Sequence, residues 1–434
     1  MVMCPRPISN GMKIFFITSK LKNQDTASGS VIEIDYMMRE LVSLGNDVTA
    51  VTVYSRDNDL TEKTPYGVLY EHVTTPRLIP AQLAVYRILK KYEKDADIFH
   101  IDAQYMYGGG LYRLLGGIRP LFAYLIRPPL IKDEYVSYFF QKRYQKKSWS
   151  LGGTFLALKK SIRYFIERFI FTPILANHVD YVSCLNPLLL KEHRQFGLKK
   201  ANYGLIIGDT YPMDAVMRKT GITTEHYQEH AGTNEKVVLY CSGRMAPGKG
   251  YDLLLEAFAR VEHKDRFKVI LGGTGPEEGM VRQAIADLGL QKNVELTGWV
   301  SREKMFEYLK MTDIYVFARW GTTLSALTLM ETMTFGIPLI VPRGTGLSWT
   351  AGKSALTFEP ENPDDLARQI ERLGADVELR RELSRQCYER LKEADIDPHQ
   401  TVVAINVIMK SLVFSPRDKY PLKRFLQGYG HSGK

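Results

Sequence analysis

The amino-acid sequence predicts an α/β protein with two doubly wound, Rossmann-like domains that face each other across a cleft, and three observations lead to this prediction. The chain has 434 residues, more than a single hydrophobic core usually serves. Short apolar runs alternate with segments of helical periodicity, which is the pattern of parallel sheets covered by helices. A polar stretch without periodicity at 223–235 separates two such series and is the predicted linker.

The first predicted domain, residues 1–225, begins with a buried-strand pattern at 13–18 and a turn of small residues at 26–30. A helix from about 31 to 44 follows, and Gly45 ends it. Further strands are predicted at 48–54, 98–101, 121–126 and 181–184.

The second predicted domain, residues 226–395, repeats the alternation more regularly. Strands are predicted at 236–241, 267–272, 294–297, 313–317, 338–341 and 354–357. Helices are predicted at 250–262, 277–289, 301–310, 325–335, 363–373 and 377–392. An apolar helix at about 396–414 is predicted to pack back on the first domain, and residues 415–434 form a basic tail.

Composition and charge narrow the functional classes. The four cysteines, Cys4, Cys184, Cys241 and Cys387, lack the spacing of a metal site, so we expect reduced core thiols of a cytoplasmic protein. No transmembrane helix and no signal peptide are expected. Residues 1–225 contain 30 Lys and Arg against 21 Asp and Glu, a net charge of +9, whereas residues 226–434 contain 28 against 27, a net charge of +1. A basic first half suits nucleic acid, a phospholipid surface or a phosphorylated acceptor.

The most informative stretch is residues 241–252, Cys-Ser-Gly-Arg-Met-Ala-Pro-Gly-Lys-Gly-Tyr-Asp, between a predicted strand and a predicted helix. Its glycines let the backbone approach a ligand, and the following helix presents free N–H groups. Arg244 and Lys249 add two positive charges. This pattern predicts a phosphate site, and the alternative is a basic loop without a ligand.

Further motifs follow in a fixed order. They are Leu271-Gly-Gly-Thr-Gly-Pro-Glu277, Leu296-Thr-Gly-Trp-Val300, Thr312-Asp-Ile-Tyr-Val-Phe317, Leu329-Met-Glu-Thr-Met-Thr-Phe-Gly-Ile-Pro-Leu-Ile340 and Phe358-Glu-Pro-Glu-Asn-Pro-Asp-Asp-Leu366. Their order and spacing resemble the family 4-type retaining glycosyltransferases, in group 1 of the glycosyl transferases, which have the two-domain GT-B fold. The resemblance covers about 236–392 and, less closely, 13–55.

The resemblance implies roles for individual residues. Arg244 and Lys249 would hold the diphosphate of a nucleotide-sugar donor, and Glu331 would bond the ribose; these three form the predicted catalytic set. Gly29 would let its loop approach the phosphates, and a helix opening at 324–327 would point N–H groups at them. The whole predicted donor-binding set is Gly29, Arg244, Lys249, Gly273, Gly275, Thr323, Leu324, Ser325, Leu327 and Glu331.

The sequence departs from the family pattern at the donor sugar. Thr323 stands where the first Glu of the family's E-x7-E motif would be, with Arg319 close in sequence. This puts the identity of the sugar in doubt and raises an alternative function, a catalytically inactive relative that acts as a binding or assembly subunit. Arg127 stands near a position where the family often has a His, and could meet a phosphorylated acceptor or the diphosphate. His100 matches another common His, for which we expect a structural role.

The chemistry implied by the resemblance needs negative charge to be stabilised on a departing diphosphate, which two cations and a helix end can do. No metal and no cofactor are expected, because the Asp364-Asp365 pair stands at a helix start rather than in a metal-binding DxD motif. A diphosphate oxygen can itself deprotonate the acceptor hydroxyl, so no residue is named as the base.

Residues 135–171 interleave aromatic residues with lysine and arginine. For 135–150, with Lys142, Arg143, Lys146 and Lys147, we expect contact with an anionic membrane or a lipid-phosphate acceptor. For 158–171 we expect a core helix with a solvated basic face. Base stacking on nucleic acid was the less favoured alternative, so no nucleic-acid partner is expected.

Together these expectations describe a retaining, metal-independent glycosyltransferase. It would move a sugar from a nucleoside diphosphate to a lipid-linked or polysaccharide acceptor, as a peripheral protein on the cytoplasmic face of the membrane.

Overall fold

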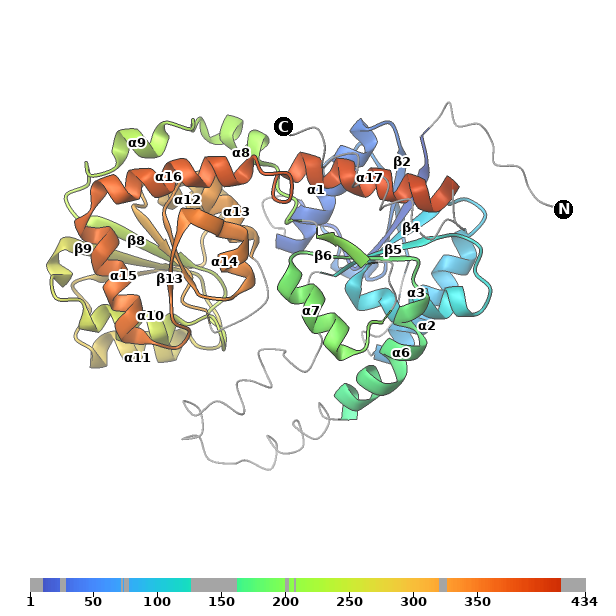
Figure 1. The fold of residues 1–434 in the computed structure, drawn as a ribbon, viewed down its shortest axis with the longest axis horizontal. Coiled ribbons are helices and arrows are strands. Elements are labelled where there is room, and N and C mark those ends of the chain that lie inside the picture. The colour runs from blue at the N-terminus through green and yellow to red at the C-terminus, as the bar shows by residue number, and fades with distance from the viewer. Residues whose placement is uncertain are drawn as a thin grey trace. The chain divides into compact units, whose positions relative to one another are not determined.

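The computed structural model describes residues 11–23, 29–71, 73, 78–125, 162–199, 203–206, 208–319 and 326–414. These residues form two compact units (Figure 1). The first contains the N-terminal sheet and the last helix of the described chain, and the second runs from Tyr211 to Asp397.

The first unit is built on a parallel sheet of seven strands in the order β3-β2-β1-β4-β5-β6-β7. The strands are β1 (Lys13–Thr18), β2 (Asp47–Thr52), β3 (Gly67–Tyr70), β4 (Ile98–Asp102), β5 (Leu121–Leu125), β6 (Tyr181–Cys184) and β7 (Tyr203–Ile206). The helices are α1 (Gly29–Ser43), α2 (Leu78–Tyr92), α3 (Met106–Leu114), α6 (Thr172–Ile174), α7 (Pro187–Phe196) and α17 (Pro398–Phe414).

The central strands β1, β4 and β5 are mostly apolar, and they are buried at every residue except Lys13 at the start of β1, as expected of strands covered on both faces. His100 lies in β4, and its ring stacks on that of Phe16 with centroids 4.2 Å apart. Burial lowers the pKa of His100 to about 3, so the ring is neutral. The side chain is therefore a core residue, which fits its predicted structural role.

The last helix, α17, adds to the core of the first unit. Val402, Ile405 and Met409 pack among the residues of that core. The side chain of Asn406 accepts a hydrogen bond from Asn46 at 3.1 Å, directly before β2. The chain thus returns to its first unit after completing the second.

The second unit is built on a parallel sheet of six strands in the order β10-β9-β8-β11-β12-β13. The strands are β8 (Val237–Ser242), β9 (Phe267–Gly272), β10 (Val294–Gly298), β11 (Ile314–Val316), β12 (Leu339–Pro342) and β13 (Ala355–Phe358). The helices are α8 (Met213–Thr220), α9 (His226–His230), α10 (Tyr251–Arg260), α11 (Glu278–Asp287), α12 (Arg302–Lys310), α13 (Leu327–Thr334), α14 (Gly346–Ala351), α15 (Pro363–Ala375) and α16 (Val377–Leu391). Every strand and helix predicted for residues 236–392 is confirmed within a few residues.

Alternate residues of these strands enter two hydrophobic cores on opposite faces of the sheet. Leu239 and Val316 belong to the core beneath α10 and α15, and Tyr240 and Phe317 to the core beneath α12, α13 and α16. Helices accordingly lie on both sides of the sheet (Figure 1). The strand order reverses between β8 and β11, and in doubly wound sheets ligands bind at the carboxyl ends of the strands at such a point.

The predicted linker is wrong. Residues 223–235 contain α9, and Tyr227 of this helix is fully buried in the core of the second unit. Its hydroxyl donates a hydrogen bond of 2.5 Å to the carbonyl of Asp313. Tyr211 and Val216 are also buried in this core, so the second unit begins before the predicted boundary at 226. One deeply buried tyrosine in a short polar helix leaves no periodicity to detect.

The expected core helix at 158–171 is also wrong over its described part, which is helical from residue 162. Ile162, Phe165 and Phe169 are exposed, whereas Glu167 is buried. The prediction of core thiols is confirmed for three of the cysteines. Cys184, Cys241 and Cys387 are free and buried, and burial raises the pKa of each thiol to about 12.

Replacing Tyr227 with Ala should lower the free energy of unfolding of the second unit by about 3 kcal/mol, because it leaves a cavity and removes the bond to Asp313. Urea denaturation followed by tryptophan fluorescence measures this change. Glu229→Ala, on the exposed side of the same helix, is the control and should change the stability by a few tenths of a kcal/mol at most. Equal stability of the two variants would restore the linker interpretation.

Candidate functional site

A glycine-rich turn joins the end of β8 to the start of α10. Gly243, Gly248 and Gly250 have φ angles of 149°, 84° and 78°, which other residues rarely adopt. Gly250 also lies against the end of β11, where an added Cβ would fall 1.9 Å from the carbonyl oxygen of Ala318. The turn therefore closes tightly over the point where the strand order reverses.

A second turn, after β9, packs against the first one. The amide of Gly243 donates to the carbonyl of Gly272 at 3.0 Å, and that of Met245 donates to Thr274 at 2.9 Å. A Cβ on Gly273 would fall 1.9 Å from the carbonyl oxygen of Gly243, and one on Gly275 would fall 2.2 Å from that of Met245. Gly273 and Gly275 thus allow close packing of the two turns, and neither lines the cavity described next.

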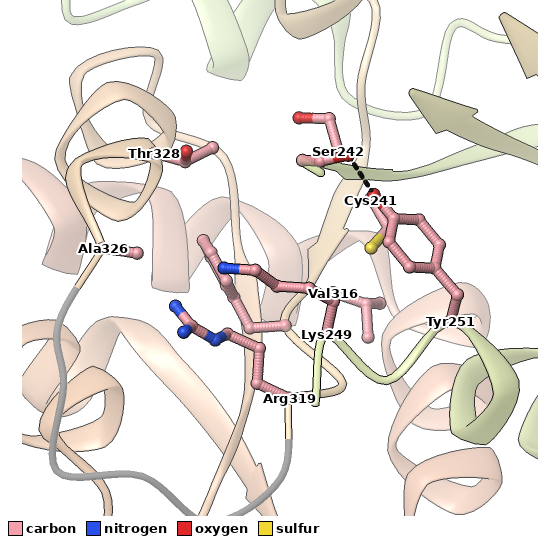
Figure 2. Close-up of a pocket in the computed structure, with 10 residues that line it drawn as sticks. Cys241, Ser242, Lys249, Tyr251, Val316, Arg319, Ala326 and Thr328 are labelled. Atoms are coloured by element: carbon pink, nitrogen blue, oxygen red, sulfur yellow. Dashed lines mark hydrogen bonds between the residues drawn. The ribbon is translucent and has the colours of Figure 1, made fainter. Parts of the chain in front are cut away.

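A cavity of about 80 Å³ opens beside the first turn. It is lined by Cys241, Ser242, Gly243, Lys249, Tyr251, Val316, Phe317, Arg319, Ala326 and Thr328 (Figure 2). The hydroxyl of Tyr251 donates to the carbonyl of Gly243 at 2.8 Å and so fixes the turn against α10. These lining residues include two cations, Lys249 and Arg319, and no Asp or Glu.

The two cations come from different parts of the sheet edge. Lys249 lies in the turn after β8, and Arg319 follows β11 with only 8% of its surface exposed. Both side chains extend into the cavity toward Ala326, which directly precedes α13 (Figure 2). Arg319 is absent from the predicted donor-binding set, although its place after a predicted strand end was a signal for it.

Helix α13 borders the cavity with its N-terminus. It begins at Leu327, and both Ala326 and Thr328 line the cavity. The first N–H groups of a helix have no partner within it and carry a partial positive charge. The cavity therefore combines two cations with a helix start, an arrangement that stabilises a phosphate or diphosphate.

Glu331 lies one turn further along α13 and is buried. Its carboxylate forms an ion pair of 2.7 Å with Arg302, the first residue of α12. Arg302 also donates to the hydroxyl of Tyr211 at 3.3 Å. Burial raises the pKa of the Glu331 carboxyl, and the charge of Arg302 opposes that rise. Glu331 does not line the cavity.

The remaining predicted residues are placed as follows. Arg244 is exposed on the first turn and does not line the cavity. Gly29 is the first residue of α1 in the first unit. The following predicted residues lie outside the described residues: Arg127, Lys142, Arg143, Lys146, Lys147, Thr323, Leu324 and Ser325.

Within the described ranges, no group of three or more His, Cys, Asp or Glu side chains is placed to hold a metal ion. No helix within the same ranges is long and apolar enough to cross a bilayer. The expectation of a metal-free reaction stays a prediction.

The chain is similar in sequence to known glycosyltransferases. Residues 223–390 match the family described as glycosyl transferases group 1. The chain is 27% identical over 214 residues to the mannosylfructose-phosphate synthase of Agrobacterium fabrum, covering 46% of each chain. It is 28% identical over 174 residues to the lipopolysaccharide core biosynthesis glycosyltransferase LpsE of Rhizobium meliloti, covering 38% of this chain and 49% of that protein. The chain thus spans about half the length of these curated relatives.

A solved structure of HepE from Anabaena in complex with UDP and glucose has a TM-score of 0.63 with this chain at 15% identity. The match covers 92% of this chain and 99% of HepE, so the likeness extends over both units. Residues 223–390 therefore match the glycosyl transferases group 1 family, and the chain has the GT-B fold.

Proposed function

We propose that this protein is a retaining, metal-independent glycosyltransferase that moves a sugar from a nucleoside diphosphate to a lipid-linked or polysaccharide acceptor at the cytoplasmic face of a membrane. One observation carries the proposal. The cavity at the carboxyl ends of β8 and β11 brings Lys249, Arg319 and the start of α13 together, and its lining contains no carboxylate. Such a cavity attracts an anion, and the family match makes a donor diphosphate the fitting one.

The reaction needs the bond between the sugar and the diphosphate to break. As this bond lengthens, negative charge develops on the departing oxygen, and Lys249 and Arg319, which both line the cavity, would stabilise it. Arg244, exposed on the same turn, would contact the diphosphate from outside the cavity. The departing oxygen would take the proton of the acceptor hydroxyl as the new bond forms on the same face of the sugar.

The named relatives support the choice of donor and acceptor. HepE was solved with UDP and glucose, and LpsE is named for lipopolysaccharide core biosynthesis. We extend a nucleoside diphosphate sugar and a glycolipid-type acceptor to this chain as part of the proposal. The net charge of +9 over residues 1–225 suits an anionic acceptor or an anionic membrane surface.

Glu331 is proposed to accept hydrogen bonds from the ribose of the donor, which requires an ionised carboxylate. Its burial works against ionisation, and the ion pair with Arg302 works in favour of it. Arg302 is therefore a positioning residue that holds the carboxylate charged and fixed. A bond to the ribose would need one carboxylate oxygen to stay available beside this pair.

The alternative, an inactive binding or assembly subunit, rests on Thr323 in place of a glutamate. Both functions include a donor site, so donor binding alone does not separate them. A transfer or hydrolysis assay does, with the anomeric configuration of the product read by NMR. Turnover with retained configuration supports the transferase, and tight donor binding without turnover on any acceptor tested would support the assembly subunit.

Lys249→Ala and Arg319→Ala should each weaken binding of the preferred nucleoside diphosphate sugar by about ten- to a hundredfold, because each removes a charge-assisted contact. A thermal-shift panel of such sugars identifies the donor, and calorimetry then measures the affinities.

Lys268→Ala is the matched control for these variants. It removes an exposed lysine of β9 that pairs with Glu295 on the surface of the same unit, and it should leave donor affinity unchanged. Unchanged affinity in Lys249→Ala and Arg319→Ala would refute the cavity as the donor site.

Arg302→Met should destabilise the second unit by about 3 kcal/mol near neutral pH, because it leaves the Glu331 carboxylate buried and unpaired. A carboxyl whose pKa is raised by folding favours the folded state while protonated and loses that contribution as pH rises through the folded-state pKa. The loss in free energy of unfolding caused by Arg302→Met should therefore become smaller as pH falls toward the ordinary pKa of a glutamate side chain. Urea denaturation across this pH range measures it.

The double variant Arg302→Met with Glu331→Gln removes the buried charge and serves as the control. It should recover most of the stability near neutral pH and show little pH dependence. A deficit of Arg302→Met that is the same at every pH would mean that Arg302 acts through packing alone.

A further inference from the structure

The segment from residue 162 to residue 174 has its apolar side turned outward. It is helical from residue 162, passes through a π-helical turn at Glu167–Phe171 and ends in α6. Five large apolar residues of this segment are between 42% and 58% exposed: Ile162, Phe165, Phe169, Ile170 and Ile174. We refer to these five residues as the apolar ridge.

The inner side of the same segment holds a charged residue. Glu167 is only 5% exposed, and its carboxylate accepts a hydrogen bond of 2.8 Å from Arg163. A helix on the surface of a soluble protein normally buries its apolar side and exposes its charges. This segment instead exposes its large apolar residues and buries Glu167, so its outer side is suited to an apolar environment.

Contacts with the rest of the first unit hold the segment in this orientation. The guanidinium of Arg168 donates to the backbone carbonyl of Gln195 and lies over the ring of Phe196 at 5.5 Å. Tyr164 packs against Phe196 as well, with ring centroids 5.7 Å apart. Tyr107 of α3 meets the side chain of Thr172 at 3.2 Å. The segment is thereby anchored on its inner side, and the ridge is not an element that has merely failed to pack.

The π-helical turn contributes to the ridge. The amide of Thr172 donates to the carbonyl of Glu167, five residues earlier, which widens the helix at this point. Phe165 and Phe169 lie on either side of the start of this turn, and their ring centroids are 4.8 Å apart. The two rings therefore form one continuous apolar surface, which isolated exposed residues would not form.

The charges beside the ridge indicate what it meets. Arg163 is half exposed at its side chain, and Arg168 lies over Phe169 at 5.9 Å. Aromatic and aliphatic side chains flanked by arginine are typical of segments that lie in the interface of an anionic bilayer.

We propose that the apolar ridge inserts into the headgroup region of an anionic phospholipid bilayer, with the half-exposed Arg163 against the lipid phosphates. This deepens the proposed function, on which it rests for the lipid-linked acceptor, because it names the surface that brings the enzyme to its substrate. The ridge lies outside the donor-binding cavity, so the two properties can be measured separately.

Co-sedimentation with vesicles tests the ridge directly. The unchanged protein should bind phosphatidylcholine vesicles that contain phosphatidylglycerol more strongly than vesicles of phosphatidylcholine alone, and added salt should weaken the binding without abolishing it. Phe165→Ser with Phe169→Ser should lower the partition coefficient on the anionic vesicles by about tenfold or more, because two rings no longer enter the bilayer.

The control replaces two exposed apolar residues of the second unit, Met280 in α11 and Leu288 directly after it, with Ser, and this variant should bind vesicles like the unchanged protein. Circular dichroism and donor thermal shift, unchanged in both double variants, would show that each is folded. If donor binding fails while vesicle binding depends on the ridge, the transferase proposal falls and the docking surface stands.

Two outcomes would overturn the docking proposal. One is vesicle binding by the Phe165→Ser, Phe169→Ser variant equal to that of the unchanged protein. The other is no vesicle binding by the unchanged protein. If the unchanged protein were then dimeric in analytical ultracentrifugation and the variant monomeric, the ridge would be a contact between two copies.

Discussion

The cavity beside the first turn depends on one close backbone approach, that of Gly250 to the carbonyl of Ala318. Without a Cβ at Gly250, the turn after β8 closes directly over the end of β11. This contact sets Lys249 beside Arg319, although the strands that these two residues follow, β8 and β11, are far apart in the sequence. The second turn then packs onto the first through Gly273 and Gly275. The glycines therefore shape the site through packing, and the cations and the start of α13 supply its chemistry.

Two buried glutamates illustrate how this fold handles charge. Glu331 and Glu167 both lie on the buried side of a helix. Each forms an ion pair with an arginine, Arg302 in the second unit and Arg163 in the first. At Glu331 the carboxylate is buried and the side chain of Arg302 is only 13% exposed, so the pair keeps a charge available inside the protein. At Glu167 the arginine reaches solvent, so the pair fixes an orientation and leaves the helix's apolar residues outside. The same pairing thus stabilises a buried carboxylate in one unit and the orientation of a surface helix in the other.

The sequence predicted the second unit well because its strands are continuous apolar runs, as at 267–272, which coincides with β9. It predicted the turn after β8 that contains Lys249, and Lys249 lines the cavity beside that turn. It did not predict Arg319 as a second cation of this cavity, because the cavity forms only when β8 and β11 become neighbours, which a local pattern does not show. It misjudged 158–171 because helical periodicity tells which residues share a side, and does not tell whether that side points inward. It missed α9 because Tyr227 alone anchors a five-residue helix.

The return of α17 to the first unit has a consequence for the order of events during synthesis. Val402, Ile405 and Met409 belong to the first core, yet the ribosome makes them after the whole of the second unit. The described residues of the second unit all lie between Tyr211 and Asp397, so this unit can fold before α17 has been made. The first unit must wait with part of its core uncovered, so the unit that is translated first is the one that is completed last.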